Sequence, residues 1–240
     1  MNWFLVLAFL FFAGSLLGWW MEFGFRNLIS HKGPHGHFFI NPGFCHGPWL
    51  PIYGVGLMVM FVISYYMTDV RGEVWMPAIL LGIGLSMTLI ELVGGWLLLH
   101  LLNLRLWDYR HFKGNLGGYI CPQFSLIWTA LGAVYYLLIH PMAIDGILWL
   151  SQHLAFSFVI GLFFGLFIPD ALTSASDAAV IREFAQDEAV VVKYEELKQM
   201  VQEHRMSNNR KAHFFDQLRN EDTDLRTFLV DHKNLMDAKK

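Results

Sequence analysis

The sequence has few charged residues and few cysteines for its length. Of 240 residues only 15% are charged, whereas 55% are hydrophobic and the mean hydropathy is +0.41. A composition this apolar excludes a single water-soluble globular domain and is typical of a membrane protein. The two cysteines, Cys45 and Cys121, are too few for a disulfide framework, and neither belongs to a Cys-x-x-Cys pair.

Several function classes lack their signatures here. A net charge of −3, without a basic run interleaved with aromatics, argues against nucleic-acid binding. The sequence holds no Walker loop, no Gly-x-Ser-x-Gly elbow and no His-Glu-x-x-His motif. We therefore expect no cofactor and no ATPase machinery in this chain, and an enzyme is less favoured than a non-enzyme.

The few charges are placed unevenly. Residues 1–169 hold 6 of the 17 basic and 6 of the 20 acidic residues, with all nine Trp and all eight Pro. We predict a transmembrane helical domain over 1–169 and a cytoplasmic tail over 170–240. Apolar residues at helical spacing lie on both sides of Ser207-Asn208-Asn209, which predicts a helical hairpin that binds a cytoplasmic protein or another copy. A loosely ordered, solvated tail is the alternative.

Five stretches are long and apolar enough to cross a bilayer, which takes about 20 residues of helix. The first lacks a basic start and ends in Trp19-Trp20, so we predict a retained span and not a signal peptide. The predicted fold is all-α, a polytopic membrane bundle followed by the tail hairpin. The spans are expected near residues 3–21, 51–67, 76–102, 121–139 and 147–168.

The distribution of Lys and Arg predicts the orientation, because cytoplasmic loops are enriched in both. One side of the membrane carries only Arg71. We therefore predict an inner or plasma membrane protein with its N-terminus outside and its tail in the cytoplasm. The opposite side carries Arg26, Lys32, Arg105, Arg110, Lys113 and Arg182.

Glu91 is the leading functional candidate. It lies about fifteen residues into the third span, where a carboxylate is costly unless it is protonated, paired or facing a polar cavity. We predict that it faces the bundle interior and takes part in substrate or ion passage; a buried packing role is the alternative. Glu22, near the end of the first span, has Arg26 four residues on, which predicts an interfacial ion pair.

Two loops on the predicted cytoplasmic side add polar candidates. The first, residues 38–56, is rich in Gly, Pro and aromatics, includes Asn41 and Tyr53, and predicts a re-entrant turn or a binding-site floor. A tight interfacial connector is the alternative.

The second loop, residues 104–128, holds an acid, a phenol and a guanidinium group in succession, at Asp108, Tyr109 and Arg110. A ring of polar side chains above Glu91 would select or gate a substrate, with an arginine holding an anionic group; an Asp108–Arg110 pair that only ties the loop is the alternative. The ring would comprise Arg26, Asn41, Asp108, Tyr109, Arg110 and Asn115.

The two halves of this region are weakly alike. Span one carries Glu22 and leads through Arg26 to Asn41-Pro-Gly-Phe, while span three carries Glu91 and leads through Arg110 to Asn115-Leu-Gly-Gly-Tyr. This pattern indicates a parallel two-helix repeat. Chance similarity from shared Gly, Trp and Phe usage is the alternative.

His31, His35 and His37 are spaced as metal ligands can be, but no carboxylate or cysteine ligand lies nearby. A flexible hydrophilic hairpin is the favoured interpretation, and we expect no metal.

Four sequence elements stand out over residues 10–135. They are Gly18-Trp19 with Glu22, Gly47-Pro48-x-x-Pro51-Ile52-Tyr53-Gly54-x-Gly56, Glu91, and Trp107-Asp108-Tyr109 with Asn115, Gly118, Ile120-Cys121 and Ser125-Leu126. Together these elements resemble the type IV ABC-transporter permease, or CmpB-like, family, to which the transmembrane protein 229 group is similar. The sequence departs from the family where Asn41-Pro-Gly-Phe-Cys and Gly118-Tyr-Ile-Cys-Pro replace its more usual runs, which removes one arginine from the expected site.

The resemblance implies a permease. We therefore predict a permease-like protein that binds or translocates a small or amphiphilic substrate, in a homo-oligomer or beside a separate ATPase subunit. The alternatives are a non-transporting scaffold or regulator with a partner-binding tail, and an intramembrane lipid-modifying enzyme that uses Asp108 or Glu91 as acid or base.

Overall fold

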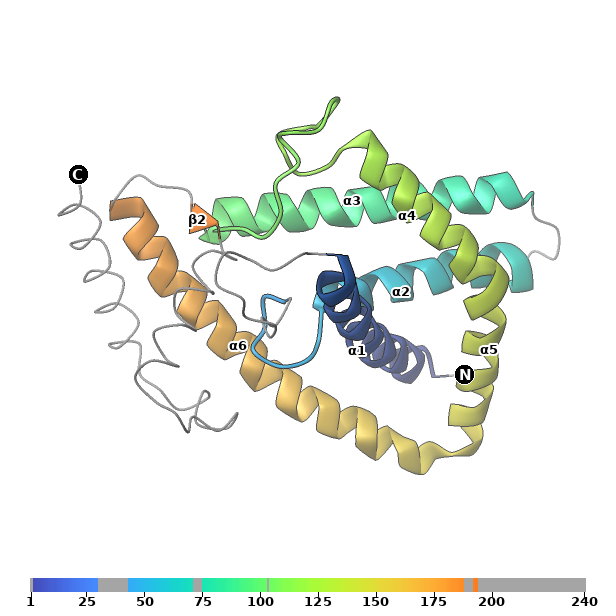
Figure 1. Cartoon of the computed structure of the whole chain (residues 1–240). Coiled ribbons are helices and arrows are strands. Elements are labelled where there is room, and N and C mark those ends of the chain that lie inside the picture. The colour runs from blue at the N-terminus through green and yellow to red at the C-terminus, as the bar shows by residue number, and fades with distance from the viewer. Residues whose placement is uncertain (1, 30–42, 71–74, 103, 188–191, 194–240) are drawn as a thin grey trace. The chain divides into compact units, whose positions relative to one another are not determined.

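A computed structural model describes residues 2–29, 43–70, 75–102, 104–187 and 192–193, and these are almost entirely helical. The main helices are α1 (Trp3–Ile29), α2 (Pro51–Ser64), α3 (Met76–Leu102), α4 (Pro122–Val134), α5 (His140–Gln152) and α6 (Ser157–Asp187) (Figure 1). Two π-helical segments, η1 (Tyr65–Val70) and η2 (Tyr135–Ile139), follow α2 and α4, and a 3₁₀ turn, η3 (Leu154–Phe156), precedes α6.

The predicted fold class is confirmed. Within the described residues, five helical stretches are long and apolar enough to cross a membrane. These stretches are Trp3–Phe25, Pro51–Thr68, Met76–Leu101, Pro122–Gln152 and Leu154–Ser176. The tail hairpin and its apolar residues beyond α6 lie outside the described residues, as does the histidine-rich segment with His31, His35 and His37.

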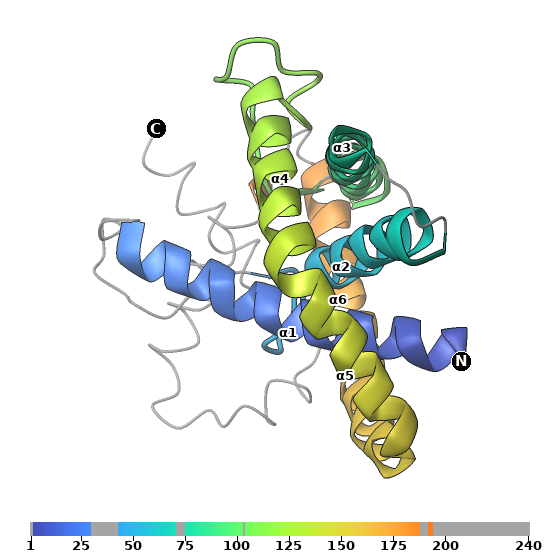
Figure 2. The same cartoon turned by 90° about the vertical axis from the view of Figure 1, so that its right-hand side faces the viewer.

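One predicted loop is wrong. Residues 140–146 were expected to separate the last two spans, but α4, η2 and α5 form one helical column from Pro122 to Gln152 (Figure 2). Pro141 lies in the first turn of α5, where a missing N–H costs little. The chain instead leaves the helical conformation at His153, whose φ is −122° and ψ is 57°.

The chain divides into two units. The first comprises residues 1–94 and 108–168 and contains a buried core. Side chains from α1, α2, α3, η2 and α5 form this core, and Trp128 of α4 packs against it. Phe61, Ile79 and Ile83 are fully buried there, and Tyr135 is 2% exposed. Glycines allow close approach between helices, since a Cβ on Gly18 would overlap the Tyr53 side chain and a Cβ on Gly54 would overlap Ser15.

The segment before α2 is irregular and buried. Residues 43–48 form bends and Leu50 is extended. Cys45 is 1% and Trp49 7% exposed, and the Leu50 N–H donates to the Ser15 carbonyl of α1 at 2.9 Å. The Trp49 ring meets the Phe163 ring of α6, with centroids 5.8 Å apart. This burial is what irregular backbone requires at membrane depth, although the re-entrant path itself stays a prediction.

The second unit comprises residues 95–107 and 169–240. It contains two short strands, β1 (Leu104–Arg105) and β2 (Val192–Lys193), which pair in parallel. Helix α6 passes without a break through Pro169, the predicted domain boundary, and the Thr173 hydroxyl donates to the Pro169 carbonyl at 2.8 Å.

Candidate functional site

Glu91 lies in α3 with both carboxylate oxygens hydrogen-bonded. The residue is 4% exposed. The Tyr109 hydroxyl donates to Oε1 at 2.6 Å, and the Trp128 indole Nε1–H donates to Oε2 at 3.2 Å. The expectation that Glu91 faces inward agrees with this burial. Its partners come from separate parts of the first unit, since Tyr109 precedes α4 and Trp128 lies within it.

Helix α4 positions Trp128 because its start is fixed. Pro122 occupies the first turn, where its fixed φ suits a helix and its missing N–H is not needed. Cys121 precedes it in an extended conformation and is 2% exposed. Two turns further, the Trp128 indole reaches Glu91, and a Cβ on Gly84 of α3 would meet Thr129 beside it. The small residue on α3 therefore lets α4 approach closely enough for the indole bond.

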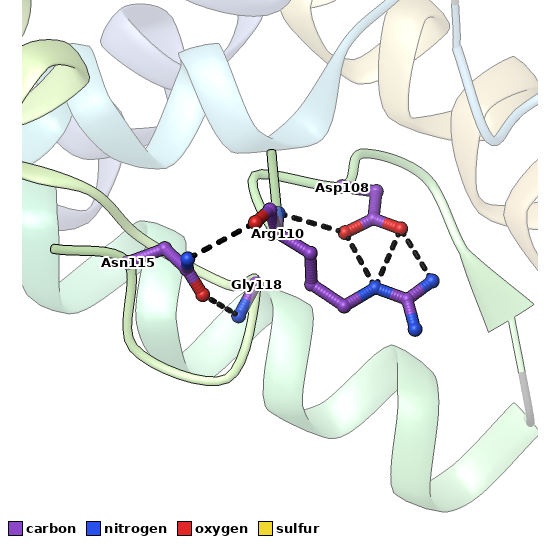
Figure 3. Close-up of polar contacts among 4 residues, drawn as sticks. All are labelled: Asp108, Arg110, Asn115 and Gly118. Carbon is purple, nitrogen blue, oxygen red and sulfur yellow. Dashed lines mark hydrogen bonds and ion pairs between the residues drawn. The ribbon is translucent and has the colours of Figure 1, made fainter. Parts of the chain in front are cut away.

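The loop before α4 is a set of tight turns that hold Tyr109. Three glycines, Gly114, Gly117 and Gly118, have φ of 73°, 60° and 77°, a region that costs other residues energy. The Tyr109 backbone N–H donates to the Gly118 carbonyl at 3.0 Å. The Asn115 side chain accepts from the Gly118 N–H at 3.1 Å and donates to the Arg110 carbonyl at 3.3 Å (Figure 3). It also donates to the Phe112 carbonyl at 2.8 Å.

Asp108 and Arg110 pair with each other on this loop. Arg110 Nε donates to both Asp108 oxygens, at 2.9 and 2.8 Å, and Nη2 lies 2.5 Å from Oδ2 (Figure 3). The Arg110 backbone N–H also donates to Asp108 Oδ1 at 3.0 Å. The Asp108 hydrogen bond and charge raise the pKa of Arg110, so its guanidinium stays charged. The geometry matches the alternative in which the pair ties the loop.

Tyr109 is held as a hydrogen-bond donor. Burial, and after it the hydrogen bond to Glu91, raises the pKa of the Tyr109 phenol far above its usual range. The phenol therefore keeps its proton at physiological pH and donates a hydrogen bond to the carboxylate. Its ring stacks on Phe124, with centroids 4.4 Å apart.

A second carboxylate–phenol pair lies in the same unit. The Tyr53 hydroxyl donates to Glu22 Oε2 at 3.1 Å and so connects α2 to α1. The Tyr53 ring also meets the Trp128 ring edge-on, with centroids 6.0 Å apart. The described contacts thus run from Glu22 through Tyr53 and Trp128 to Glu91.

The structure brings together part of the predicted site. Glu22 and Tyr53 form one pair and Glu91 and Tyr109 another, while Arg110 contacts both Asp108 and Asn115 on the loop. The Arg26 side chain and Asn41 lie outside what the structure describes, so the Glu22–Arg26 ion pair stays a prediction. Among the described residues, no group of three His, Cys, Asp or Glu side chains forms a metal site.

Sequence reasoning missed Trp128. The signal was its position, because an indole usually prefers the membrane interface at the end of a span. Trp128 instead lies inside a span, and a buried indole N–H needs an acceptor. An intramembrane carboxylate on the preceding span was the obvious partner.

Most of the chain matches a known protein family. A family described as "Putative ABC-transporter type IV" matches residues 9–175, which include both carboxylates and all their described partners. No curated protein and no solved structure matches the chain. The similarity to the transmembrane protein 229 group therefore stays a prediction.

Proposed function

The chain belongs to the ABC-transporter type IV family, and from this premise we propose that it is a permease-like subunit that binds a small or amphiphilic substrate at Glu91. The observation that carries the proposal is a carboxylate inside a spanning helix, 4% exposed, whose two oxygens accept bonds from two different elements. Intramembrane ionisable groups are expensive, and they commonly mark substrate or ion pathways.

A purely structural role explains the arrangement less well. A carboxylate that only packs helices together is replaceable by an apolar side chain without desolvation cost. Here three aromatic residues, Tyr109, Trp128 and Phe124, and a loop with three positive-φ glycines are arranged around one acid. Precise support of this kind is what a binding site needs.

The remaining residues take supporting roles in this proposal. Tyr53 connects Glu22 to the rings beside Glu91, and Asn115, Asp108 and Arg110 hold the loop that carries Tyr109. Arg26 and Asn41 retain their predicted place at the cytoplasmic mouth.

The proposed orientation has the N-terminus outside and the tail in the cytoplasm. Moving the break between the last two spans from residues 140–146 to His153 leaves the charge count unchanged, because the sequence has no Lys or Arg between Lys113 and Arg182. Since the sequence lacks a Walker loop, a separate subunit would supply ATP hydrolysis. Self-association and a tail-bound cytoplasmic partner complete the proposal.

Native mass spectrometry of the full-length protein tests the proposal. We expect a bound small molecule or lipid that the Glu91→Gln variant loses, because the amide removes the negative charge and keeps the size. Lys113→Gln is the control, since Lys113 is exposed on the loop between the spans and its replacement also removes a charge and leaves an amide. Equal ligand retention by Glu91→Gln would contradict the assignment, and a ligand-free assembly held together by the tail would favour the scaffold.

A further inference from the structure

The charge of Glu91 has no charged partner in the described part of the chain. Both of its hydrogen-bond partners, Tyr109 and Trp128, are neutral donors. The guanidinium on the neighbouring loop belongs to Arg110, which is bound to Asp108 and exposed. A buried carboxylate without a countercharge is costly, so a positive charge from outside would stabilise the site.

The hydrogen bonds that Glu91 accepts do not use all of its acceptor positions. Tyr109 and Trp128 both donate, one to each oxygen, and neither accepts. The 2.6 Å distance to the Tyr109 hydroxyl falls in the range of charge-assisted O–H···O⁻ bonds. A carboxylate has about four acceptor positions, so two bonds leave capacity for a further donor.

The rings around Glu91 favour an organic cation over a hydrated metal ion. Trp128 and Tyr109 contact the carboxylate directly, Phe124 stacks on Tyr109, and Tyr53 meets Trp128 edge-on. Aromatic faces attract ammonium groups, and Trp does so most strongly. Metal ions such as Mg²⁺ and Ca²⁺ instead take several oxygen ligands, and the described residues hold no cluster of acidic, histidine and cysteine side chains that could bind one.

We propose that the Glu91 site binds an organic ammonium cation, with the carboxylate facing the charge and the Trp128 and Tyr109 rings facing its alkyl groups. This rests on the proposed function, because it names the class of substrate that the same site takes. An anionic substrate is disfavoured, since it would bring a second negative charge beside a buried carboxylate.

The test measures binding of three probes to the full-length protein by isothermal titration calorimetry. The protein is held in a maltoside detergent, which has no ammonium group to compete. Choline and ethanolamine are the cationic probes. The control probe is 3,3-dimethyl-1-butanol, which has the shape of choline with carbon in place of nitrogen. We expect a cation to bind at least about tenfold more tightly than the neutral alcohol, and Glu91→Gln to weaken that binding at least about tenfold.

Trp128→Phe separates the ring contribution from the charge. It keeps an aromatic face but loses the indole bond to Glu91, so we expect a smaller loss, about threefold to tenfold. Lys113→Gln should bind like wild type. Monodisperse elution of each variant in size-exclusion chromatography shows that it is folded.

Each other result overturns the proposal. Equal affinity for choline and the neutral alcohol, or binding unaffected by Glu91→Gln, would show that the Glu91 carboxylate does not recognise the positive charge of the ligand. The same holds if neither ammonium probe binds. If mass spectrometry then finds a neutral or anionic ligand that depends on Glu91, the proposed function stands and only the ammonium class is wrong. If no ligand depends on Glu91, the proposed function fails as well.

Discussion

The two helix pairs, α1–α2 and α3–α4, each hold one carboxylate, but they bury it differently. Glu22 on α1 is half-buried and accepts a bond from Tyr53 of α2 at 3.1 Å. Glu91 on α3 is 4% exposed and accepts two bonds, one from α4 and one from the loop before it. The donors from α4 and from the loop give each buried oxygen of Glu91 a partner, which burial of a carboxylate requires.

Two local features recur in both pairs. The second helix of each begins at a proline, Pro51 or Pro122, and each passes into a π-helical segment at a Tyr-Tyr pair that begins at Tyr65 or Tyr135. Single π-helical turns often lie at functional sites. This common plan supports the predicted duplication, which stays a prediction, and it makes matched substitutions in the two pairs informative.

The largest expected effect comes from the close approach of α1 to α2. A side chain at Gly18 would overlap Tyr53, so Gly18→Leu should push the helices apart and cost about 3 kcal/mol or more of stability, the upper end for overpacking. The measurement is the thermal unfolding midpoint in detergent, with size-exclusion chromatography to detect aggregation.

Gly24→Leu is the control within the same helix, because nothing lies within 4 Å of a Cβ at Gly24. Gly84→Ala gives the comparison with the second pair, where the added atom would meet the Thr129 side chain and not a ring fixed against a helix. A Gly18→Leu protein as stable as Gly24→Leu would mean that α1 and α2 do not pack this closely.

The sequence was sufficient for the fold class and for much of the site. Helical spans are readable because a bilayer forces about 20 apolar residues to be consecutive. Glu91 was readable for the related reason that an acid inside such a run needs an explanation. Tyr109 was named from its loop, although its role as a donor to Glu91 depends on how the loop folds.

Other features depend on geometry that no local pattern encodes. Pro141 and Gly146 are typical of a loop, yet residues 140–146 are helical because the proline falls in a first helical turn. The ring contact from Tyr53 to Trp128 depends on the packing of α2 against α4, which spans 75 positions of sequence. Such contacts between distant residues are set by tertiary packing.

Removing the phenol hydroxyl from each helix pair compares the stability that the two phenol–carboxylate hydrogen bonds contribute. Tyr109→Phe removes a short bond to a buried acid and should cost about 1.5–3 kcal/mol, whereas Tyr53→Phe should cost about 0.5–1.5 kcal/mol. Thermal unfolding midpoints measured side by side test the order. A larger loss for Tyr53→Phe would make the Glu22 pair the more important polar centre.

The pH dependence of stability under alkaline conditions gives an independent measurement of what the Tyr109 hydroxyl contributes. The pKa of Tyr109 is raised in the folded protein, so the folded state keeps its proton where an unfolded tyrosine, with a pKa of about 10, loses it. This stabilisation is complete below pH of about 10 and is lost as the pH rises further. The wild-type midpoint should therefore fall more steeply than that of Tyr109→Phe between pH of about 9 and about 11.

The smallest expected effect is on the loop. Asp108→Asn weakens an ion pair in which the Arg110 side chain is 57% exposed and the Asp108 side chain 17%, so at physiological salt the unfolding midpoint should fall only slightly. Asn115→Ala should lower the midpoint more, because it leaves the Gly118 N–H and the Phe112 carbonyl without their bonds and loosens the turn that holds Tyr109. If Asp108→Asn is instead the more damaging change, the ion pair and not the asparagine turn sets the position of Tyr109, and Arg110 then acts on Glu91 indirectly through the loop.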